Sequence, residues 1–281
     1  MGVSCSCMNE VLRRKNGGWN KHTPVDLDRF VGMARIEIEE AHMKRSDKWF
    51  AVISLGRQAF KTDTSTTTSK PVWKSGVKVV LDKDGPSIAR ICVYDFNRTR
   101  NNVLVGICDL DLKFIPSKEG QEPERQELVL FDPSTKKTTV GTITVSYISE
   151  SRDVVLRDFA KRLLAIVDLD GNGTLSINEF KELVKAFGNP VSSKKLEELF
   201  NNCDLNKDGT VCVDELANLI VSADSEDFSA FTVKQCPVCG ESLKDYDDLN
   251  DIIHMSLCFN EDPFDQTMTG GFLTDKQAAN G

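Results

Sequence analysis

Two acidic loops that share one pattern constrain this chain more than any other feature. They read "DLDGNGTLSINEF" from Asp168 and "DLNKDGTVCVDEL" from Asp204, and their first residues lie 36 positions apart. In each loop, oxygen-bearing side chains stand at positions 1, 3 and 5, glycine at position 6 and glutamate at position 12. Alternate residues of a tight loop point inward, so this spacing gathers oxygen ligands around one hard cation. The pattern predicts two metal-binding loops.

The chemistry of these loops favours calcium over magnesium. Each loop carries three carboxylates, and glutamate at position 12 offers two oxygens, which makes the cage too wide for magnesium. Gly173 and Gly209 permit the sharp turn. Position 9 is Ser176 in the first loop and Cys212 in the second, and a thiol positions a bridging water poorly, so we expect the second loop to bind more weakly. With position 7 contributing a backbone carbonyl, the expected ligands are Asp168, Asp170, Asn172, Thr174 and Glu179 in loop one, and Asp204, Asn206, Asp208, Thr210 and Glu215 in loop two.

Apolar residues at helical spacing flank both loops. "RDVVLRDFAKRLLAIV" and "NEFKELVKAFG" enclose the first loop, and "SSKKLEELFNNC", which begins with a serine cap, and "DELANLIVS" enclose the second. This arrangement resembles a paired EF-hand unit, which we place at residues 151–225. The resemblance implies two calcium ions and a short strand pairing between Leu175 and Val211. A structural pair that binds metal without switching is the alternative.

In the chain before this unit, the apolar residues are spaced differently. Eight short runs rich in Val, Ile and Phe, from "MARIEIEEA" to "GTITVSYIS", are separated by turn signals such as Asp84-Gly85-Pro86. This pattern predicts a β-sandwich over residues 31–150. The order of "SDKWFAVISLG", "SKPVWKS" and "ARICVYDFNRTRNNVLVGICDLDL" resembles a C2 domain.

The C2-like region departs from the calcium-binding pattern of its family. Members that bind calcium gather several aspartates in two loops, because the ion needs six to eight oxygens. Asp47 and Asp95 match, whereas Asn97, Asn101 and Asn102 replace later aspartates, and we expect Glu40 and His42 in the upstream loop. We therefore expect this region to bind calcium weakly or not at all. Its basic residues either meet anionic headgroups, at about 1 kcal/mol each, or are solvated charges of a docking or spacer module; they are Lys44, Arg45, Lys48, Arg98 and Arg100.

A third cluster of ligands follows the EF-hand-like unit. "CPVCGESLKDYDDLNDIIHMSLC" places Cys236, Cys239, His254 and Cys258 in a C-x2-C-x14-H-x3-C arrangement. His254 and Cys258 are four residues apart and so share one face of a helix. Three thiolates and one imidazole complete a tetrahedral zinc site with no open position, so a structural zinc module is expected over residues 232–262. A redox Cys-x-x-Cys is the alternative, but no βαβ pattern surrounds it.

The remaining features bear on location and partners. The net charge is -8, which argues against nucleic-acid binding, and no apolar run is long enough to span a membrane. The chain begins "MGVSCSC", which fits N-terminal myristoylation at Gly2 with Cys5 or Cys7 as a second acylation site. We therefore expect residues 1–30 to be a flexible, acylated arm, and we expect peripheral or lipid-anchored attachment to membranes.

Domain order and local sequence resemble one family. With "KRLLAIVD", "KAFGN", "IHMSLCF" and "MTGGFLTD", the chain resembles the N-terminal half of the extra-mitochondrial plant phosphatidylserine decarboxylases. The resemblance implies a place in phosphatidylethanolamine synthesis on the cytosolic face of endomembranes. The full-length family forms a pyruvoyl cofactor at the serine of a Gly-Ser-Thr motif. None of the 18 glycines here is followed by serine, so this chain does not encode the pyruvoyl group and no catalytic residue is assigned.

These observations predict a multidomain protein: an all-β C2-type sandwich, an all-α EF-hand pair, a small zinc segment, and a tail at residues 263–281 that would lead into a catalytic domain. The expected function is a calcium-binding, membrane-associated regulatory region without its catalytic part. A free-standing calcium sensor or adaptor and a fragment of an active decarboxylase are the alternatives, so enzyme status is left open. The expected partners are an anionic membrane surface and a decarboxylase catalytic domain or other protein. That protein would bind an EF-hand groove lined by Phe180, Leu183, Val184, Phe187, Leu196, Leu199, Phe200, Leu216 and Leu219.

Overall fold

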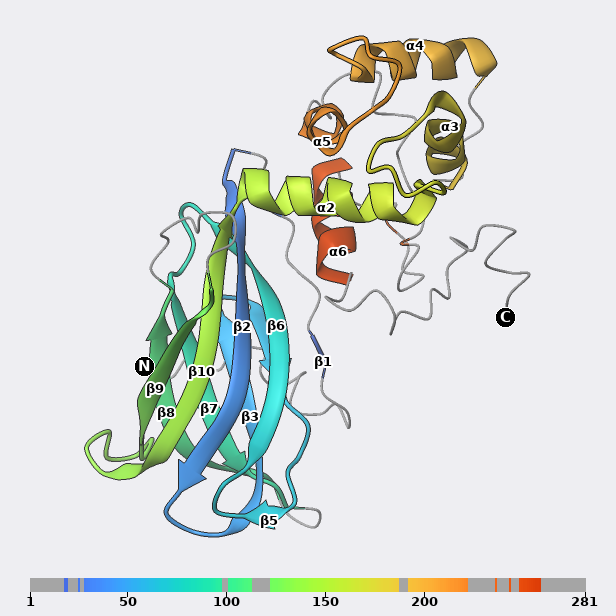
Figure 1. Ribbon diagram of the computed structural model, residues 1–281. Helices are drawn as coiled ribbons and strands as arrows, with labels where there is room; N and C mark the ends of the chain where they lie inside the picture. The colour runs from blue at the N-terminus through green and yellow to red at the C-terminus, as the bar shows by residue number, and fades with distance from the viewer. Residues whose placement is uncertain are drawn as a thin grey trace. The chain divides into compact units, whose positions relative to one another are not determined.

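The computed structural model forms two compact units, Met1–Arg152 and Asp153–Gly281, which we describe separately (Figure 1). The structure describes residues 18–19, 25, 28–97, 101–112, 122–186, 192–221, 236, 243 and 248–258. None of the helices in these ranges is long and apolar enough to cross a membrane.

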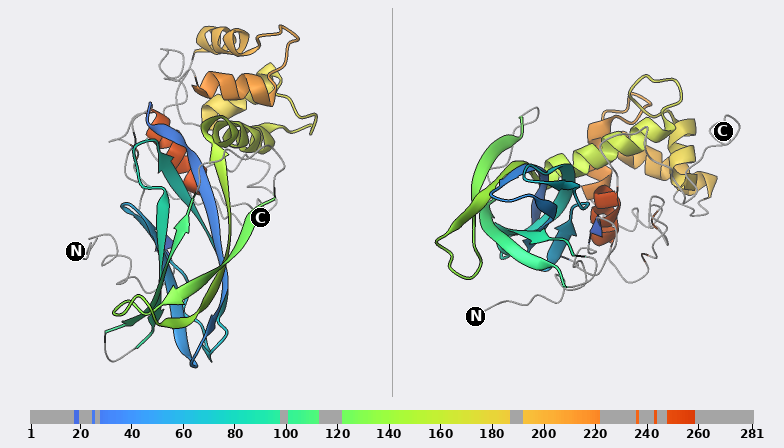
Figure 2. Two further views of the ribbon diagram at one scale, coloured as in Figure 1. Left: turned by 90° about the vertical axis from the view of Figure 1, so that its left-hand side faces the viewer. Right: turned by 90° about the horizontal axis from the view of Figure 1, so that it is seen from below.

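The first unit is an antiparallel β-sandwich, as expected. Its strands pair in the order β1-β4-β3-β7-β8-β9-β10-β2-β6, with β5 on β3. Strands β4-β3-β7-β8 and β9-β10-β2-β6 form the two layers, which are linked through one register pair, Ile107 of β8 with Phe131 of β9 (Figure 2). The strands are β1 Gly18–Trp19, β2 Phe30–Met43, β3 Asp47–Leu55, β4 Gln58–Lys61, β5 Thr67–Thr68, β6 Val72–Asp82, β7 Ile88–Asp95, β8 Val103–Asp111, β9 Glu124–Phe131 and β10 Thr139–Ser151.

Strand β3 explains why the run "KWFAVISLG" is apolar without alternation. Successive side chains of a strand point to opposite faces. Trp49 and Ile53 join the core between the layers, and the Trp49 indole donates to the Thr68 carbonyl at 2.7 Å. Phe50 lies in a second buried cluster on the opposite face, where it stacks on Tyr94 with ring centroids 5.1 Å apart. Both faces of β3 are therefore buried, which requires an uninterrupted apolar sequence.

Two glycines allow the long β2–β10 ladder to close. Gly141 pairs with Met43 at one end, and Gly32 pairs with Ser151 at the other. A Cβ on Gly141 would lie 2.2 Å from the His42 carbonyl oxygen, and one on Gly32 would lie 1.9 Å from that of Glu150. Neither position accepts a side chain while the strands keep this spacing.

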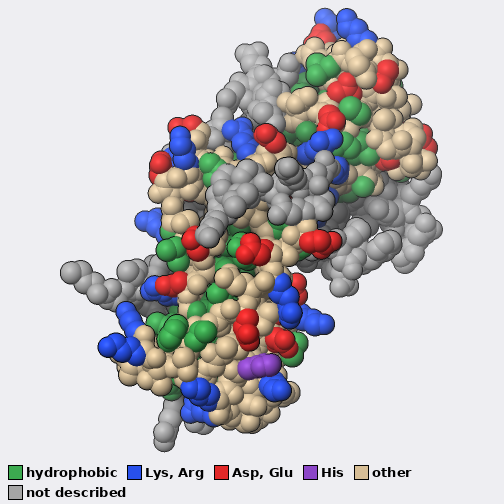
Figure 3. Space-filling model, turned by 60° about the vertical axis from the view of Figure 1, so that its left-hand side comes forward, with side chains coloured by type: hydrophobic (Ala, Val, Ile, Leu, Met, Phe, Trp, Pro, Cys, Tyr) green, Lys and Arg blue, Asp and Glu red, His purple; other side chains and the backbone are tan. Residues whose placement is uncertain are grey.

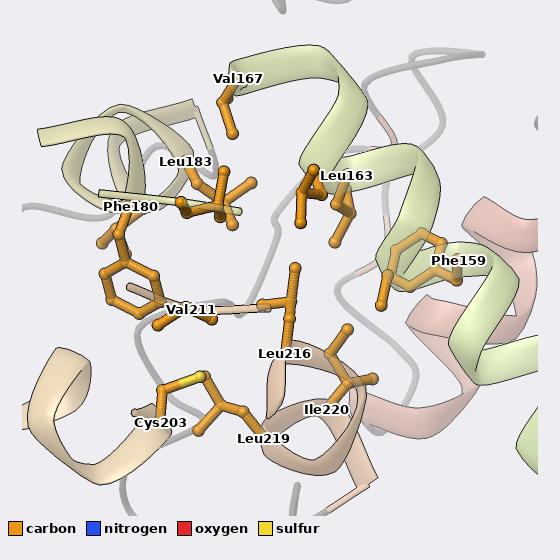
Figure 4. Close-up of a cluster of buried hydrophobic side chains, with 14 of the residues drawn as sticks. Phe159, Leu163, Val167, Phe180, Leu183, Cys203, Val211, Leu216, Leu219 and Ile220 are labelled. Atoms are coloured by element: carbon orange, nitrogen blue, oxygen red, sulfur yellow. The ribbon is translucent and has the colours of Figure 1, made fainter. Parts of the chain in front are cut away.

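The second unit is helical, and its helices match the four predicted flanking segments. They are α2 Arg152–Val167, α3 Ile177–Ala186, α4 Ser193–Cys203 and α5 Val213–Val221, followed by α6 Asp248–Cys258. The expected serine cap is present, because the Ser192 hydroxyl accepts a hydrogen bond from the Lys195 backbone N–H at 3.3 Å. One apolar core joins these helices (Figure 4). In this core the rings of Phe180 and Phe200 meet edge to face, with centroids 5.5 Å apart.

Candidate metal centre

The loop between α2 and α3 holds its carboxylates in place with backbone N–H groups. Asp168 at position 1 accepts from Gly171 N at 2.8 Å and Gly173 N at 2.9 Å. Glu179 at position 12 accepts from Leu169 N at 2.9 Å and Ser176 N at 2.9 Å, one bond to each carboxylate oxygen. The chain therefore folds back on itself, and the two acids at the ends of the loop approach each other.

Three carboxylates of this loop converge on one point. Ligand oxygens of Asp168, Asp170 and Glu179 all lie within 4.8 Å of one another. Like charges at this spacing repel unless a cation lies between them. The Asn172 side-chain oxygen accepts from Thr174 N at 2.8 Å, so position 5 is also anchored by the loop backbone. Loop one thus brings together three of its five predicted ligands, and their oxygens suit a hard cation such as calcium.

The loop between α4 and α5 repeats several of these backbone hydrogen bonds, but its carboxylates do not converge as closely as those of loop one. Asp204 accepts from Gly209 N at 2.9 Å, as Asp168 does from Gly173 in the first loop. Glu215 accepts from Leu205 N at 3.0 Å and Cys212 N at 3.0 Å. Position 5 is also held in the same way, because Asp208 accepts from Thr210 N at 2.8 Å. Two loops of different sequence therefore fold alike because their backbone N–H groups bond equivalent carboxylates.

The two loops join through a short antiparallel bridge. Leu175 N donates to Val211 O at 2.8 Å, and Val211 N donates to Leu175 O at 2.9 Å. Both side chains are fully buried in the helical core. The strand pairing expected from position 8 is thus present, and it connects the two loops directly.

Hydrogen bonding keeps the loop carboxylates ionised. The bond from Gly173 N, followed by weaker ones, lowers the pKa of Asp168, and the bonds from Thr210 lower the pKa of Asp208. Burial raises the pKa of Glu179 and Glu215, but bonds from Ser176 and Cys212 outweigh it, so both end below their usual values. All four side chains are therefore charged at neutral pH and ready to bind a cation.

Backbone conformation at position 4 distinguishes the loops, and the ligand pattern of the sequence does not reveal it. Gly171 occupies this position in loop one with φ of 70°, and Lys207 occupies it in loop two with φ of 59°. The left-handed region favours glycine and is strained for lysine. Loop two therefore contains a strained backbone position that loop one lacks.

A charged cluster also lies at one end of the sandwich. Arg45 Nη2 is 2.8 Å from Asp95 Oδ2 and 3.9 Å from Asp47 Oδ2, and its guanidinium lies 5.4 Å from the centre of the Trp49 ring. Burial, and then the charge of Asp47, raise the pKa of Asp95, while Arg45 opposes them. The positive charge between Asp47 and Asp95 is thus the Arg45 guanidinium, in the place where a calcium ion would bind. The sequence pattern does not predict this contact, because it presents Arg45 only as a solvated charge or a headgroup ligand.

The other residues expected at this end have different roles. Glu40 and His42 lie within strand β2 rather than in a loop, so the expected upstream loop is wrong. The Asn102 side chain accepts from Asn97 N at 3.2 Å and supports the loop backbone. Lys and Arg side chains are interspersed with Asp and Glu over the face in Figure 3, so that face is not a continuous basic surface. Arg98 and Arg100 lie outside the described residues.

Family models match both units. Residues 39–128 match the C2 domain model, and residues 157–221 match the EF-hand domain pair model. The chain carries a C2 domain followed by an EF-hand pair. The fold class expected from the sequence is confirmed for these two parts.

Comparisons with known proteins confirm the resemblance to the plant decarboxylases. Phosphatidylserine decarboxylase proenzyme 2 of Oryza sativa subsp. japonica is 47% identical over 204 residues, which are 73% of this chain and 32% of that protein. The chain therefore spans about a third of the length of this relative. Together with the C2 and EF-hand matches, this similarity fits a calcium-binding regulatory region.

Two further similarities cover single domains. Aequorin-2 of Aequorea victoria is 35% identical over 68 residues, 24% of this chain and 35% of that protein. Among solved structures, a C2 domain of plant Extended Synaptotagmin 1 is 21% identical, with a TM-score of 0.38, over 44% of this chain and 97% of that one.

Position 9 separates the two EF-hand loops chemically. The Ser176 hydroxyl donates to Glu179 Oε2 at 2.8 Å. In loop two the equivalent residue is Cys212, and burial raises the pKa of its thiol. Position 9 of loop two therefore carries a neutral thiol, which is the difference on which the expected weaker binding depends.

The residues expected to bind zinc are only partly described. Cys236 is fully buried, and His254 is buried on helix α6. Cys258 is the last residue of the same helix, as expected from its spacing to His254, but its side chain lies outside the described residues, as does all of Cys239. Gly2, Cys5 and Cys7, the expected acylation sites, and Phe187 of the expected groove also lie outside them.

Proposed function

We propose that this chain is a calcium-responsive regulatory region in which the EF-hand pair binds two calcium ions. The expected ligands in loop one are Asp168, Asp170, Asn172, Thr174 and Glu179, and those in loop two are Asp204, Asn206, Asp208, Thr210 and Glu215. The main support is the convergence of three carboxylates of loop one within 4.8 Å, in a loop whose backbone hydrogen bond from position 6 to position 1 is repeated in loop two.

A calcium titration of the whole chain by calorimetry tests this proposal. We expect two binding events with dissociation constants on the order of 10⁻⁷–10⁻⁵ M, the range of sensor EF-hands. Asp168→Ala and Asp204→Ala should each remove one event. The matched control is Asp214→Ala, which removes an acid at position 11 of loop two that pairs with Arg157 at 2.9 Å. Unchanged stoichiometry in Asp168→Ala and Asp204→Ala would reject the ligand assignment.

A structural zinc site formed by Cys236, Cys239, His254 and Cys258 is part of the same proposal. Its support is the donor set and its spacing, together with the burial of Cys236 and His254. Three thiolates and an imidazole fill a tetrahedral site and hold the chain together without catalysis.

Elemental analysis of the purified protein tests the zinc site. We expect one zinc per chain, which is lost in Cys236→Ser and in His254→Ala. His42→Ala and Cys212→Ser are suitable controls, because they remove an exposed histidine and a thiol outside this set. Zinc retained by the His254→Ala variant would exclude histidine as a ligand.

We further propose that the C2 domain and an acylated N-terminus hold the chain on the cytosolic face of an anionic endomembrane. The match to the C2 domain model supports peripheral binding, and the exposed Lys44 and Lys48 supply positive charge. One myristoyl chain on Gly2 binds only marginally, so a second signal at Cys5, at Cys7 or in the basic cluster Arg13-Arg14-Lys15 is needed. Gly2→Ala should release the protein from membranes in a fractionation experiment, and retention would assign the anchor to the C2 domain or a partner.

The enzymatic context follows from the decarboxylase similarity. We propose that the EF-hand pair regulates a phosphatidylserine decarboxylase catalytic domain, with a free-standing calcium sensor as the second candidate. Decarboxylation of phosphatidylserine by this chain should be undetectable. Addition of calcium should change the activity of a decarboxylase catalytic domain that contains the Gly-Ser-Thr motif when this chain is present. If neither calcium nor this chain changes the activity of the catalytic domain, the free-standing sensor is favoured.

A further inference from the structure

The segment after the EF-hand pair contributes to the core of that pair. Cys236, Leu243, Ile252 and Met255 are at most 2% exposed, and they belong to the same buried cluster as the helices that flank the metal loops. These residues come from three places in the sequence, all beyond Val221, the last residue of α5. Several parts of the C-terminal segment are thus buried with the EF-hand helices.

Residues 250–256 of helix α6 are all buried, and one face of the helix belongs to this core. Ile252 and Met255 are three residues apart, so they share a helix face. The views in Figures 1 and 2 agree in placing α6 against α2, whose buried side chains include Phe159 and Leu163 of the same cluster. Figure 4 shows Phe159 on the side of the core that faces α6, with Ile220 of α5 nearby.

The described apolar residues predicted to line a partner groove are buried in the core of this unit. Of the expected groove residues, Phe180, Leu183, Leu199 and Leu216 are fully buried. In the described part of this unit, the exposed large apolar side chains are Leu169, Ile177 and Leu205, which stand at positions 2 and 10 of the metal loops. Apart from Ile177, the first residue of α3, the described helices thus present no large exposed apolar side chain to a second protein.

We propose that α6 is the target helix of this EF-hand pair, bound within the same chain, and that its docking is coupled to calcium. EF-hand pairs bind amphipathic helices through apolar anchors, and calcium favours the open form that receives them. A helix that binds the open form raises calcium affinity, and calcium strengthens docking by the same factor. The inference rests on the proposed calcium binding. Calcium binding would then affect α6, the helix that carries the candidate zinc ligands His254 and Cys258.

The test uses the full chain with the two apolar anchors of α6, Ile252 and Met255, replaced by alanine. Ile252→Ala/Met255→Ala should weaken calcium binding about fivefold or more, the usual lower limit of such coupling, as measured by competition with a chromophoric chelator. Adding a peptide of residues 246–260 should restore the affinity, and the same peptide with both anchors as alanine should not. The control is Val103→Ala, an exposed apolar residue of the C2 domain.

Hydrogen exchange provides an independent readout. Calcium should slow exchange of the α6 amides in the wild-type chain, and far-ultraviolet circular dichroism should show that the double variant is folded. A folded double variant with calcium affinity within twofold of wild type, or α6 exchange that ignores calcium, overturns this inference alone. If the double variant does not fold, the exchange measurement on the wild type decides. A wild-type chain that binds no calcium overturns the proposed function as well, so the two failures are distinguishable.

Discussion

At the scale of single residues, the two metal loops differ at position 4 although their ligands are alike. A Cβ on Gly171 would meet no atom within 4 Å, so any cost of a side chain there comes from the backbone alone. Lys207 already bears that cost at φ of 59°. The ligand pattern could be read from the sequence, but this difference could not, because both residues fit the loop motif.

Exchanging the residue types at position 4 should destabilise loop one but not loop two. Gly171→Ala should lower the free energy of unfolding of the EF-hand unit by about 1 kcal/mol, the cost of a left-handed side-chain-bearing residue. Lys207→Gly should be neutral or stabilising, because it relieves the same strain. Calcium-free thermal unfolding measures both changes, and a Gly171→Ala variant as stable as wild type would show that the loop relaxes.

Arg45 is the second decisive residue, because its guanidinium occupies the space between Asp47 and Asp95. A bound cation there would have to displace a charge-assisted hydrogen bond of 2.8 Å. The sequence-based prediction of weak or no calcium binding by the C2 domain rested on missing aspartates, and this contact adds a second physical argument for that prediction.

Removing the guanidinium tests that cause. In the Asp168→Ala/Asp204→Ala background, we expect no calcium binding to the C2 domain below millimolar concentrations. Arg45→Gln in that background should expose the two carboxylates and add one weak event in calorimetry. Arg90→Gln, which breaks a surface pair with Asp109, is the control. Calcium binding to the double-loop variant with Arg45 intact would contradict this account.

At the scale of elements, strand alternation predicted the sandwich well, because all eight apolar runs coincide with strands. The errors occur where pairing, rather than apolar pattern, decides the structure. Strand β2 continues through Glu40 and His42 because β10 pairs alongside, with Thr142 opposite His42. The two-residue strands β1 and β5 are too short to carry a period, so no sequence pattern predicts them.

The β2–β10 ladder yields a prediction about glycine. Gly141→Ala should destabilise the C2 domain by about 2 kcal/mol or more, because its Cβ would lie 2.2 Å from a backbone oxygen that cannot rotate away. Gly76→Ala in β6 is the matched control, because nothing lies within 4 Å of its added Cβ. Denaturant unfolding followed by tryptophan fluorescence compares the two, and equal stabilities would show that the strands separate at low cost.

At the scale of the whole molecule, the sequence indicated the order of a C2 domain and an EF-hand pair but not how the C-terminal segment packs. The spacing of His254 and Cys258 predicted their common helix, and α6 contains both. The burial of Ile252 and Met255 with the EF-hand core depends on contacts between segments far apart in sequence, and a local pattern does not encode them.

The buried cysteines provide a check on both units at once. Burial raises the pKa of Cys92 to about 11 and those of Cys108 and Cys203 to about 12. At pH 8 these thiols are almost entirely protonated, and the thiolate is the reactive form. Iodoacetamide at pH 8 should therefore leave all three unmodified in the folded chain and alkylate them in guanidinium, as peptide mass spectrometry can show. Rapid labelling of Cys203 alone would indicate that the EF-hand unit opens.

The paired backbone hydrogen bonds between Leu175 and Val211 bear on the shape of the calcium response. When one loop closes on its ion, the bridge fixes part of the backbone of the other loop. The second ion then binds a loop that has already lost part of its conformational entropy, so its binding is more favourable. Occupancy should then rise more steeply with calcium concentration than it would at two separate sites. At the midpoint, fewer molecules would then hold a single ion than at two independent sites, and a small change in calcium would produce a larger change in the protein.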